Sequence, residues 1–318
     1  MKSYLVTGGA GFIGSHVMKA LLTRGDKVIC VDNFDGYYDP QLKEDRIKIF
    51  LGDYKFPVEH LDISDFKAME KVFNNYNFEY ICHLAARVGV RASIENPFIY
   101  EQTNIKGTLN LLELARNFGV KNFIYASSSS VYGGNKKIPF KEKEAVDSPI
   151  SVYAATKKAS ELIAHAYHHL YGLRCTGLRF FTVYGPWGRP DMAIFKFTKN
   201  ILAGKPIEIF NFGRHARDFT YIDDIVDGVV AALDKSYPFK IINLGNSKAV
   251  SLKYLISLLE KSLGKKAIKK VLDLQPGDMK KTNANITEAK KLLDYSPKIR
   301  IKEGVNKFIK WYTGYYAT

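Results

Sequence analysis

Residues 4–17, "YLVTGGAGFIGSHV", join a short apolar run to a helical pattern through glycines at positions 8, 11 and 14. A strand that turns sharply into a helix needs positions without side chains wherever a phosphate approaches the backbone and the helix N-terminus. We therefore interpret this stretch as the first strand, turn and helix of a dinucleotide-binding unit. Glycine turns also join ordinary strands to helices, so the stretch alone leaves that alternative open.

The next strand-like run, "KVICVDN" at residues 27–33, ends in Asp32, eighteen residues after Gly14. An acidic side chain at that place accepts hydrogen bonds from the adenosine ribose hydroxyls, and its charge repels a 2′-phosphate. The spacing therefore favours NAD over NADP as the cofactor. The alternative is that Asp32 only caps the end of the strand.

Short runs rich in Val, Ile and Phe alternate with helical patterns as far as Phe180. This alternation is typical of a parallel sheet with helices on both faces. Beyond Phe180, Pro/Gly-rich loops such as "YGPWGRPD" interrupt the rhythm. We expect an α/β fold with a Rossmann-type doubly wound parallel sheet in residues 1–180 and a smaller C-terminal α/β substrate lobe in residues 181–318. Residues 219–243 are expected to return to the first domain.

The composition is that of an ordinary globular protein, since 46% of the 318 residues are hydrophobic and 25% are charged. No window approaches the roughly 18 apolar residues that a membrane span needs, so we expect a cytoplasmic protein without a membrane partner. Cys30, Cys82 and Cys175 stand singly in apolar runs without CxxC spacing. They predict buried free thiols, and no disulfide framework and no metal site.

Lysine and arginine outnumber aspartate and glutamate by 47 to 32, which gives a formal net charge of +15. A basic chain can bind nucleic acid or another polyanion. Many of these lysines recur near the C-terminus on what we interpret as solvated helix faces, without a zinc-finger or RNP-type pattern. We expect no nucleic-acid partner. The alternative is that the excess positive charge creates an electrostatic field that attracts an anionic small molecule or nucleic acid.

Tyr153 and Lys157 stand four residues apart at the start of a helix predicted over about 152–171. Side chains at i and i+4 project from one helical face, so the ammonium can lie near the phenol. A positive charge at ~4 Å and an effective dielectric of ~20 favours the phenolate by up to ~4 kcal/mol. That stabilisation would make the tyrosine a usable general base near neutral pH. The pair also occurs by chance in structural helices.

Four motifs, "TGGAGFIG" (7–14), "HLAA" (83–86), "SSSSVYG" (127–133) and "YAATKKASE" (153–161), follow one another along the chain. In this order and spacing they resemble the extended short-chain dehydrogenase/reductase family of nucleotide-sugar epimerases and dehydratases, over essentially the whole chain. "FFTVYGPWGRPDMAIFKF" (180–197) and "GRHARDFTYIDDIVDGV" (213–229) are similar to UDP-glucuronate 4-epimerases in particular.

The resemblance implies a set of site residues. The implied catalytic residues are Ser128, Tyr153 and Lys157. The implied NAD contacts, which also include the last two of these, are Gly8, Gly11, Phe12, Ile13, Gly14, Asp32, Asn33, Asp62, Ile63, Leu84, Ala85, Ala86 and Asn104.

The serine-rich loop separates members of the family. The related 4,6-dehydratases carry an Asp-Glu pair and the uronate decarboxylases a glutamate where this chain has Ser129 and Ser130. The resemblance therefore implies NAD-dependent 4-epimerisation of a UDP-hexuronate, UDP-glucuronate to UDP-galacturonate, through a transient 4-keto intermediate. The alternatives are a UDP-glucose/UDP-galactose 4-epimerase, a related nucleotide-sugar reductase, or a non-catalytic NAD-sensing or nucleic-acid-binding protein. A plain Ser/Thr-rich strand end is the other interpretation of the loop.

The expected contacts to a UDP-sugar substrate are three arginines, three hydroxyl side chains and one carboxylate: Arg91, Arg189, Arg217, Ser129, Ser130, Thr182 and Asp278. An arginine fork suits a diphosphate or a carboxylate, although surface salt bridges are the alternative for each arginine. Ser129 and Ser130 would bind the sugar carboxylate, and Thr182 would bind that carboxylate or the neighbouring phosphate. Asp278 resembles the family's contact to the nucleotide ribose. Ala92 stands where the glucuronate epimerases carry an aromatic residue, which indicates a wider site near the sugar.

The helical segments 104–119 and 152–172 carry more apolar residues than one core-facing stripe needs. In the family that this chain resembles, the corresponding helices pair across a two-fold axis into a four-helix bundle. We therefore expect a homodimer.

Overall fold

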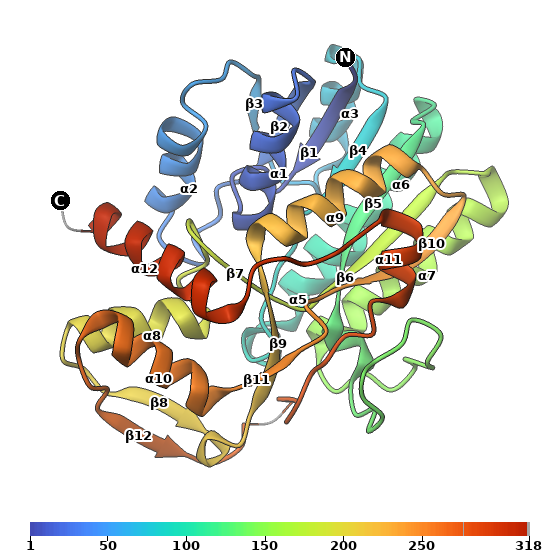
Figure 1. Ribbon diagram of the computed structural model, residues 1–318. Helices are drawn as coiled ribbons and strands as arrows, with labels where there is room; N and C mark the ends of the chain where they lie inside the picture. The colour runs from blue at the N-terminus through green and yellow to red at the C-terminus, as the bar shows by residue number, and fades with distance from the viewer. Residues whose placement is uncertain (276, 317–318) are drawn as a thin grey trace.

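The computed structural model describes residues 1–275 and 277–316. At its centre is a seven-stranded parallel sheet with the order β10-β6-β5-β4-β1-β2-β3 (Figure 1). The strands are β1 (Ser3–Thr7), β2 (Lys27–Asp32), β3 (Val58–His60), β4 (Tyr80–His83), β5 (Asn122–Ser128), β6 (Cys175–Phe180) and β10 (Phe239–Leu244). The strand order reverses between β1 and β4, so the doubly wound Rossmann-type sheet predicted from the sequence is confirmed.

Helices cover both faces of this sheet. They are α1 (Phe12–Thr23), α3 (Phe66–Asn75), α6 (Gly107–Asn117), α7 (Val152–Tyr171) and α9 (Ile222–Lys235). Helices α1 and α9 contribute to one core, and α3, α6 and α7 contribute to the other. In β1, Tyr4 and Val6 enter the first core and Leu5 enters the second, because successive side chains of a strand point to opposite faces.

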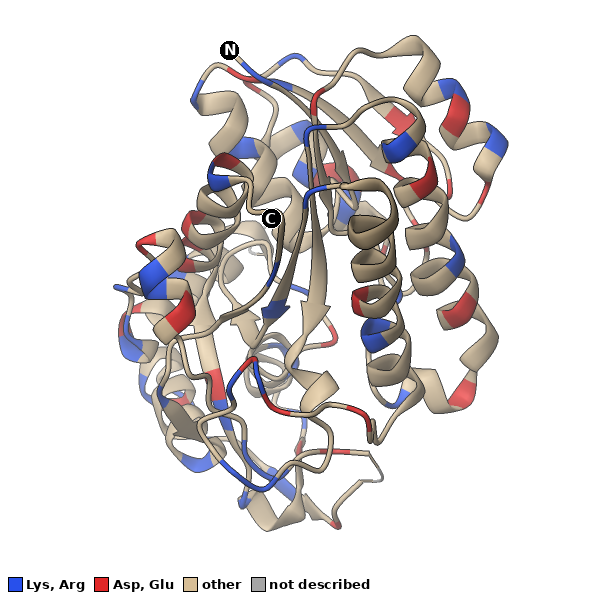
Figure 2. Ribbon diagram, turned by 90° about the vertical axis from the view of Figure 1, so that its right-hand side faces the viewer, with Lys and Arg blue, Asp and Glu red and all other residues tan. Residues whose placement is uncertain are grey.

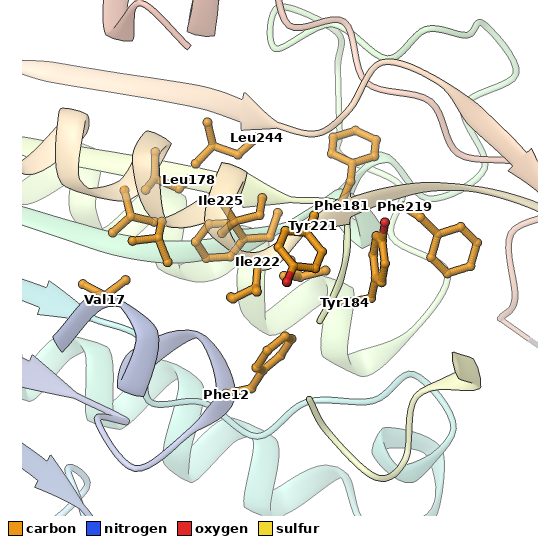
Figure 3. Packing of buried hydrophobic residues seen from close by; sticks show 14 of the residues in the cluster. Phe12, Val17, Leu178, Phe181, Tyr184, Phe219, Tyr221, Ile222, Ile225 and Leu244 are labelled. Atoms are coloured by element: carbon orange, nitrogen blue, oxygen red, sulfur yellow. The ribbon is translucent and has the colours of Figure 1, made fainter. Parts of the chain in front are cut away.

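The first core holds α1 and α9 together. Figure 3 shows Phe12 and Val17 of α1 on one side and Ile222, Ile225 and Leu178 on the other, and all five side chains are at most 5% exposed. The segment 222–235 is therefore packed on the main sheet, far along the chain from β1. Strand β10 follows α9 and pairs in parallel with β6 at the edge of the sheet.

A second part of the molecule contains a three-stranded sheet, β11-β9-β7, and a two-stranded sheet, β12-β8. Its strands are β7 (Thr182–Tyr184), β8 (Ile207–Phe210), β9 (Ala216–Tyr221), β11 (Ala249–Ser251) and β12 (Lys269–Leu272). The remaining α-helices are α2 (Gln41–Asp45), α4 (Ala92–Glu95), α5 (Pro97–Tyr100), α8 (Ala193–Leu202), α10 (Leu252–Leu263), α11 (Thr287–Leu293) and α12 (Ile301–Tyr316). In Figure 1, α8, α10, β8 and β12 form a smaller lobe beside the main sheet.

Local signals fix the ends of α7, which carries Tyr153 and Lys157. The Ser151 hydroxyl accepts a hydrogen bond from the Ala154 N–H at 3.1 Å and so satisfies an amide of the first turn. Gly172 ends the helix with φ 68°, in the left-handed region that favours glycine. The helix therefore begins and ends where the sequence pattern predicts.

Acidic and basic residues are interspersed along the outer helices (Figure 2). Within residues 1–275 and 277–316, no helix is long and apolar enough to cross a membrane. Cys30, Cys82 and Cys175 are buried and free, as predicted. The described side chains include no group of three or more His, Cys, Asp or Glu that is arranged to hold a metal ion.

Candidate active site

A cavity lies beyond the ends of β1, β4 and β5 and extends to the loops of the second lobe. Doubly wound sheets bind ligands at this edge, where the strand order reverses. Most of the site residues predicted from the sequence line it: Gly8, Gly11, Phe12, Ile13, Gly14, Asp32, Asn33, Asp62, Ile63, Leu84, Ala85, Ala86, Ser128, Ser129, Ser130, Tyr153, Lys157, Thr182, Arg189, Arg217 and Asp278.

The turn after β1 is closely packed against neighbouring backbone. A Cβ atom on Gly8, whose φ is +70°, would lie 2.6 Å from the Ala85 nitrogen. A Cβ atom on Gly14 would lie only 2.0 Å from the Gly8 carbonyl oxygen, and one on Gly11 would lie 2.9 Å from it. Only glycine fits these positions, and α1 begins directly behind them. The turn and the helix N-terminus therefore fit the pyrophosphate of a dinucleotide.

Asp32 ends β2 and is 6% exposed. Its Oδ1 accepts hydrogen bonds from the Phe34 N–H at 2.9 Å and from the Lys43 ammonium at 3.3 Å. Asp32 and Lys43 both line the cavity, so a buried charge pair stands where an adenosine ribose would lie.

Ser128 is the centre of a hydrogen-bond chain at the end of β5. Its Oγ accepts from the Ser130 N–H at 3.1 Å and from the Ser130 hydroxyl at 2.9 Å. The hydroxyl of Ser128 in turn hydrogen-bonds the Tyr153 phenol. Because Ser130 donates to Ser128, the proton of Ser128 is left to point toward Tyr153 or a ligand.

Burial dominates the titration of the Tyr153 and Lys157 pair. It raises the pKa of the Tyr153 phenol, while the hydrogen bond from Ser128 and the charge of Arg189 oppose the rise. Burial also lowers the pKa of Lys157 to about 8. The Lys157 ammonium donates to the Ala126 carbonyl at 2.8 Å. The cationic side chain that lowers the phenol pKa in the structure is thus Arg189, from the second lobe.

Two arginines of the cavity are held by neighbouring carboxylates. Arg189 Nε donates to Asp191 Oδ1 at 3.0 Å, and its Nη2 donates to Oδ2. Arg217 Nη2 donates to Asp278 Oδ1 at 2.7 Å. Each pairing fixes the planar guanidinium and leaves other N–H groups for an anionic ligand, because the group has five donors.

Two predicted residues lie outside the described cavity lining. The Arg91 guanidinium lies over the ring of Phe210, 4.0 Å from its centroid. Asn104 is 1% exposed, and its amide accepts from the Arg87 N–H at 2.8 Å and donates to the Arg87 carbonyl at 3.0 Å. Asn104 therefore braces the loop after β4, whose residues 84–90 do line the cavity.

Sequence reasoning missed several polar residues of the lining, among them Asp35, Tyr37, Lys43, Arg87 and Asp191. Arg87 forms an ion pair with Asp35, and the Tyr37 phenol hydrogen-bonds Asp191. These contacts join loops that are far apart in the chain, so no local spacing marks them. Of these residues, Asp191 could have been predicted from the sequence, because it stands two residues after Arg189 in "GRPD".

The glycine turn and the acidic end of β2 on this sheet define a Rossmann-type dinucleotide-binding protein. The family model described as the NAD dependent epimerase/dehydratase family matches residues 4–245, and the chain belongs to that family.

Individual relatives are similar over nearly their whole length. The chain is 50% identical, over 98% of its length and 96% of the relative, to a UDP-glucuronate 4-epimerase of Thermodesulfobacterium geofontis. The structure matches a UDP-glucuronic acid 4-epimerase from Bacillus cereus in complex with UDP-glucuronic acid and NAD, with a TM-score of 0.92, 38% identity and coverage of 99% and 100% of the two chains. A UDP-glucose 4-epimerase with UDP-glucose from Thermotoga maritima matches with a TM-score of 0.89, 33% identity and coverage of 98% and 99%. The family resemblance predicted from the motifs is confirmed.

Proposed function

We propose that the protein is an NAD-dependent nucleotide-sugar 4-epimerase that interconverts UDP-glucuronate and UDP-galacturonate. The relatives named UDP-glucuronate 4-epimerase support the substrate, and the NAD-containing neighbour supports the cofactor. The glycine turn supports NAD as the cofactor independently, because a pyrophosphate can approach the backbone closely where the turn has no side chains.

The pairing of the carboxylates in the cavity carries the proposal. Four of the five carboxylates in the described lining form ion pairs: Asp32 with Lys43, Asp35 with Arg87, Asp191 with Arg189 and Asp278 with Arg217. The fifth, Asp62, accepts from the Asn33 amide and the Ser64 N–H. Eliminating water from an oxidised sugar needs an additional free acid or base. A 4-keto sugar would therefore find no unpaired carboxylate in the described lining to assist elimination of water, and this supports the return of its hydride, the step that epimerisation requires.

When it is bound, NAD supplies the acceptor and then the donor of the hydride at C4 of the sugar. The residues of the chain handle the proton. Tyr153, as phenolate, takes the proton of the sugar 4-hydroxyl and returns it when the 4-keto intermediate is reduced. Ser128 would donate a hydrogen bond to the reacting oxygen. Arg189 provides the positive charge that lowers the pKa of the phenol, and Lys157, held by the Ala126 carbonyl, would bind the ribose. Between the two steps the hexose turns and presents the other face of C4.

Neutral hydroxyls and paired arginines suit a uronate diphosphate. Ser129 and Thr182 would donate hydrogen bonds to the C5 carboxylate, where a protein carboxylate would repel it. Ser130 would join them only by turning its proton away from Ser128, to which it donates in the structure. Arg189 would bind the anionic end of the sugar or the diphosphate. Arg217 would bind the diphosphate, and Asp278 would bind the nucleotide ribose. Arg91 would act from the rim, and Asn104 would support the nicotinamide ribose through the loop after β4.

The decisive experiment incubates the purified protein with UDP-glucuronate and, separately, with UDP-glucose, and resolves the products by NMR. We expect UDP-galacturonate from UDP-glucuronate, with NAD neither added nor consumed. Conversion of UDP-glucose alone would make the protein a UDP-glucose/UDP-galactose 4-epimerase. Reduction of the sugar that occurs only in a parallel reaction with added NADH, and consumes it stoichiometrically, would indicate a reductase. No conversion of either sugar would favour a non-catalytic NAD-sensing or nucleic-acid-binding protein.

We also propose a division of labour along the chain. Residues 1–180, with about 219–243, form the NAD-binding domain, and the rest of 181–318 forms the nucleotide-sugar-binding domain. The location of α9 and β10 on the main sheet supports the return of the later segment, although β9, which precedes them, pairs with β7 and β11. A cytoplasmic location, where nucleotide sugars are made, and the absence of a nucleic-acid partner belong to the same proposal.

A homodimer would cover apolar side chains on α6 and α7. Leu109 is 40% exposed and Leu162 is 59% exposed, and the two helices pack against one another. A second copy of the same pair of helices would remove these side chains from water. Light scattering at micromolar concentration should give twice the chain mass of 36.0 kDa. The single-chain mass would reject the dimer.

A further inference from the structure

Arg46 is the largest of the fully buried side chains, with 0% exposure. It begins a π-helical turn directly after α2, outside the set of residues discussed above for NAD or substrate. Within residues 1–275 and 277–316, no carboxylate forms an ion pair with it. Burying an arginine without a carboxylate is costly unless its donors are otherwise satisfied, so its hydrogen bonds should explain why it is there.

The guanidinium of Arg46 binds backbone oxygens of two loops. Nη1 donates to the Ala10 carbonyl at 3.0 Å, in the middle of the glycine turn, and to the Tyr38 hydroxyl at 2.7 Å. Nε and Nη2 donate to the Trp187 carbonyl at 3.1 and 2.7 Å, and Nη2 also reaches the Gly188 carbonyl at 3.4 Å. One planar group thus joins the turn that fits the dinucleotide to the loop that leads into Arg189.

We propose that Arg46 is a positioning residue that couples the order of the dinucleotide turn to that of the Arg189 loop. A ligand that orders one loop lowers the cost of ordering the other, because both share a rigid fork. NAD bound at the glycine turn would thereby set the backbone of Trp187 and present Arg189 to Tyr153 and the sugar nucleotide. The inference rests on the proposed use of the cavity for NAD, but it does not depend on the identity of the sugar.

The protein offers a direct reporter of this coupling. It contains only two tryptophans, Trp187 and Trp311, and Trp187 lies outside the described cavity lining, so bound NAD need not touch it. The Trp311 indole N–H has no hydrogen-bond partner among the described residues, so Trp311→Phe removes the second tryptophan without leaving a polar group unpaired. Excitation at wavelengths that tyrosine does not absorb then selects Trp187. Trp187 emission in that variant then reports the Arg189 loop.

The experiment titrates the full-length Trp311→Phe protein, freed of bound nucleotide, with NAD alone. Calorimetry measures binding, and fluorescence measures the change at Trp187. We expect NAD to change the Trp187 emission. Adding Arg46→Lys, which keeps the charge but loses the fork, should abolish most of that change while NAD binding weakens by no more than about tenfold. Arg24→Lys is the matched control. The Arg24 guanidinium also forms several hydrogen bonds, but it bridges Asp26 and Asp234 at the surface.

Three results would overturn the proposal: no emission change in the Trp311→Phe protein, an unaltered change in the Arg46→Lys variant, or complete loss of NAD binding in it. The last would make Arg46 part of the NAD site and not a link. If Arg46→Lys does not fold, Tyr38→Phe decides the matter, because it deletes one of the hydrogen bonds of Arg46 and should reduce the emission change. Failure of the protein to epimerise UDP-glucuronate would leave each of these outcomes readable, since no sugar nucleotide is used.

Discussion

The half of the cavity that we propose for the dinucleotide and the half that we propose for the sugar are built in different ways. Gly8, Gly14 and Asp32 belong to one strand–helix–strand unit, and the glycines act through the space that they leave for the backbone and its ligand. The sugar half uses side-chain donors from separate segments, such as Arg189 and Arg217, each held by its own carboxylate.

This difference teaches how each half can fail. A site formed by closely packed backbone is destroyed by adding one methyl group, because the backbone atoms around the glycine cannot move away from it. A site made of side-chain donors is weakened by removing one donor, and the loss depends on the charge of the ligand. Mutations should therefore affect NAD affinity in the first half and substrate preference in the second, with the largest effect where the halves meet.

Tyr153 lies at that meeting point. Tyr153→Phe removes the proton acceptor and little else, so turnover should fall by about 10²- to 10⁴-fold while NAD and UDP still bind. Single-turnover kinetics and calorimetry measure the two effects. Tyr167→Phe is the control on the same helix, because that hydroxyl bonds Glu113 on the outer surface. Turnover close to that of the unmodified protein in Tyr153→Phe would end the proposed mechanism.

Gly14→Ala tests the backbone half. Its Cβ would lie 2.0 Å from the Gly8 carbonyl oxygen, so the turn must open and lose N–H contacts to the pyrophosphate. Losing two such charged hydrogen bonds should weaken NAD binding by about a hundredfold or more. Gly36→Ala is the matched control, because a Cβ there meets nothing within 4 Å. Equal NAD affinity in the two variants, measured by calorimetry on folded protein, would remove the glycine turn from the site.

The same division explains what the sequence could predict. The glycine turn, Asp32 and the Tyr153–Lys157 spacing follow local rules of strand, turn and helix, and the structure brings all of them into one cavity. The pairing of Arg189 with Asp191 and of Lys43 with Asp32 depends on how loops fold over the sheet edge. Periodicity and motif spacing carry no information about such contacts. The effect of Lys157 on the phenol was likewise expected from spacing, whereas burial, the hydrogen bond from Ser128 and the charge of Arg189 govern the pKa of Tyr153 in the structure.

Thr182→Ala tests the side-chain half. If Thr182 donates to the C5 carboxylate, kcat/KM for UDP-glucuronate should fall by about ten- to a hundredfold, and kcat/KM for UDP-glucose, which has no charge there, should change little. Ser130→Ala should differ, because its hydroxyl bonds Ser128 and its loss disturbs the reacting oxygen of either sugar. Thr182→Ser keeps a hydroxyl and should retain the preference. Equal losses on both sugars in Thr182→Ala would mean that the threonine only shapes the loop.

Asp32→Ala should give the smallest effect, because it alters the preference for NAD over NADP and leaves the glycine turn intact. The substitution removes an acceptor for the ribose hydroxyls and the charge that repels a 2′-phosphate, so the ratio of NAD to NADP affinity should fall by about tenfold or more. The Lys43 ammonium, 3.3 Å from Asp32 Oδ1, loses its partner and becomes available to the phosphate. Lys43→Met in the Asp32→Ala background should therefore take back part of the gain in NADP binding. An unchanged cofactor ratio in Asp32→Ala would reduce the residue to a cap on β2, and the preference for NAD would then have to come from the shape of the ribose pocket.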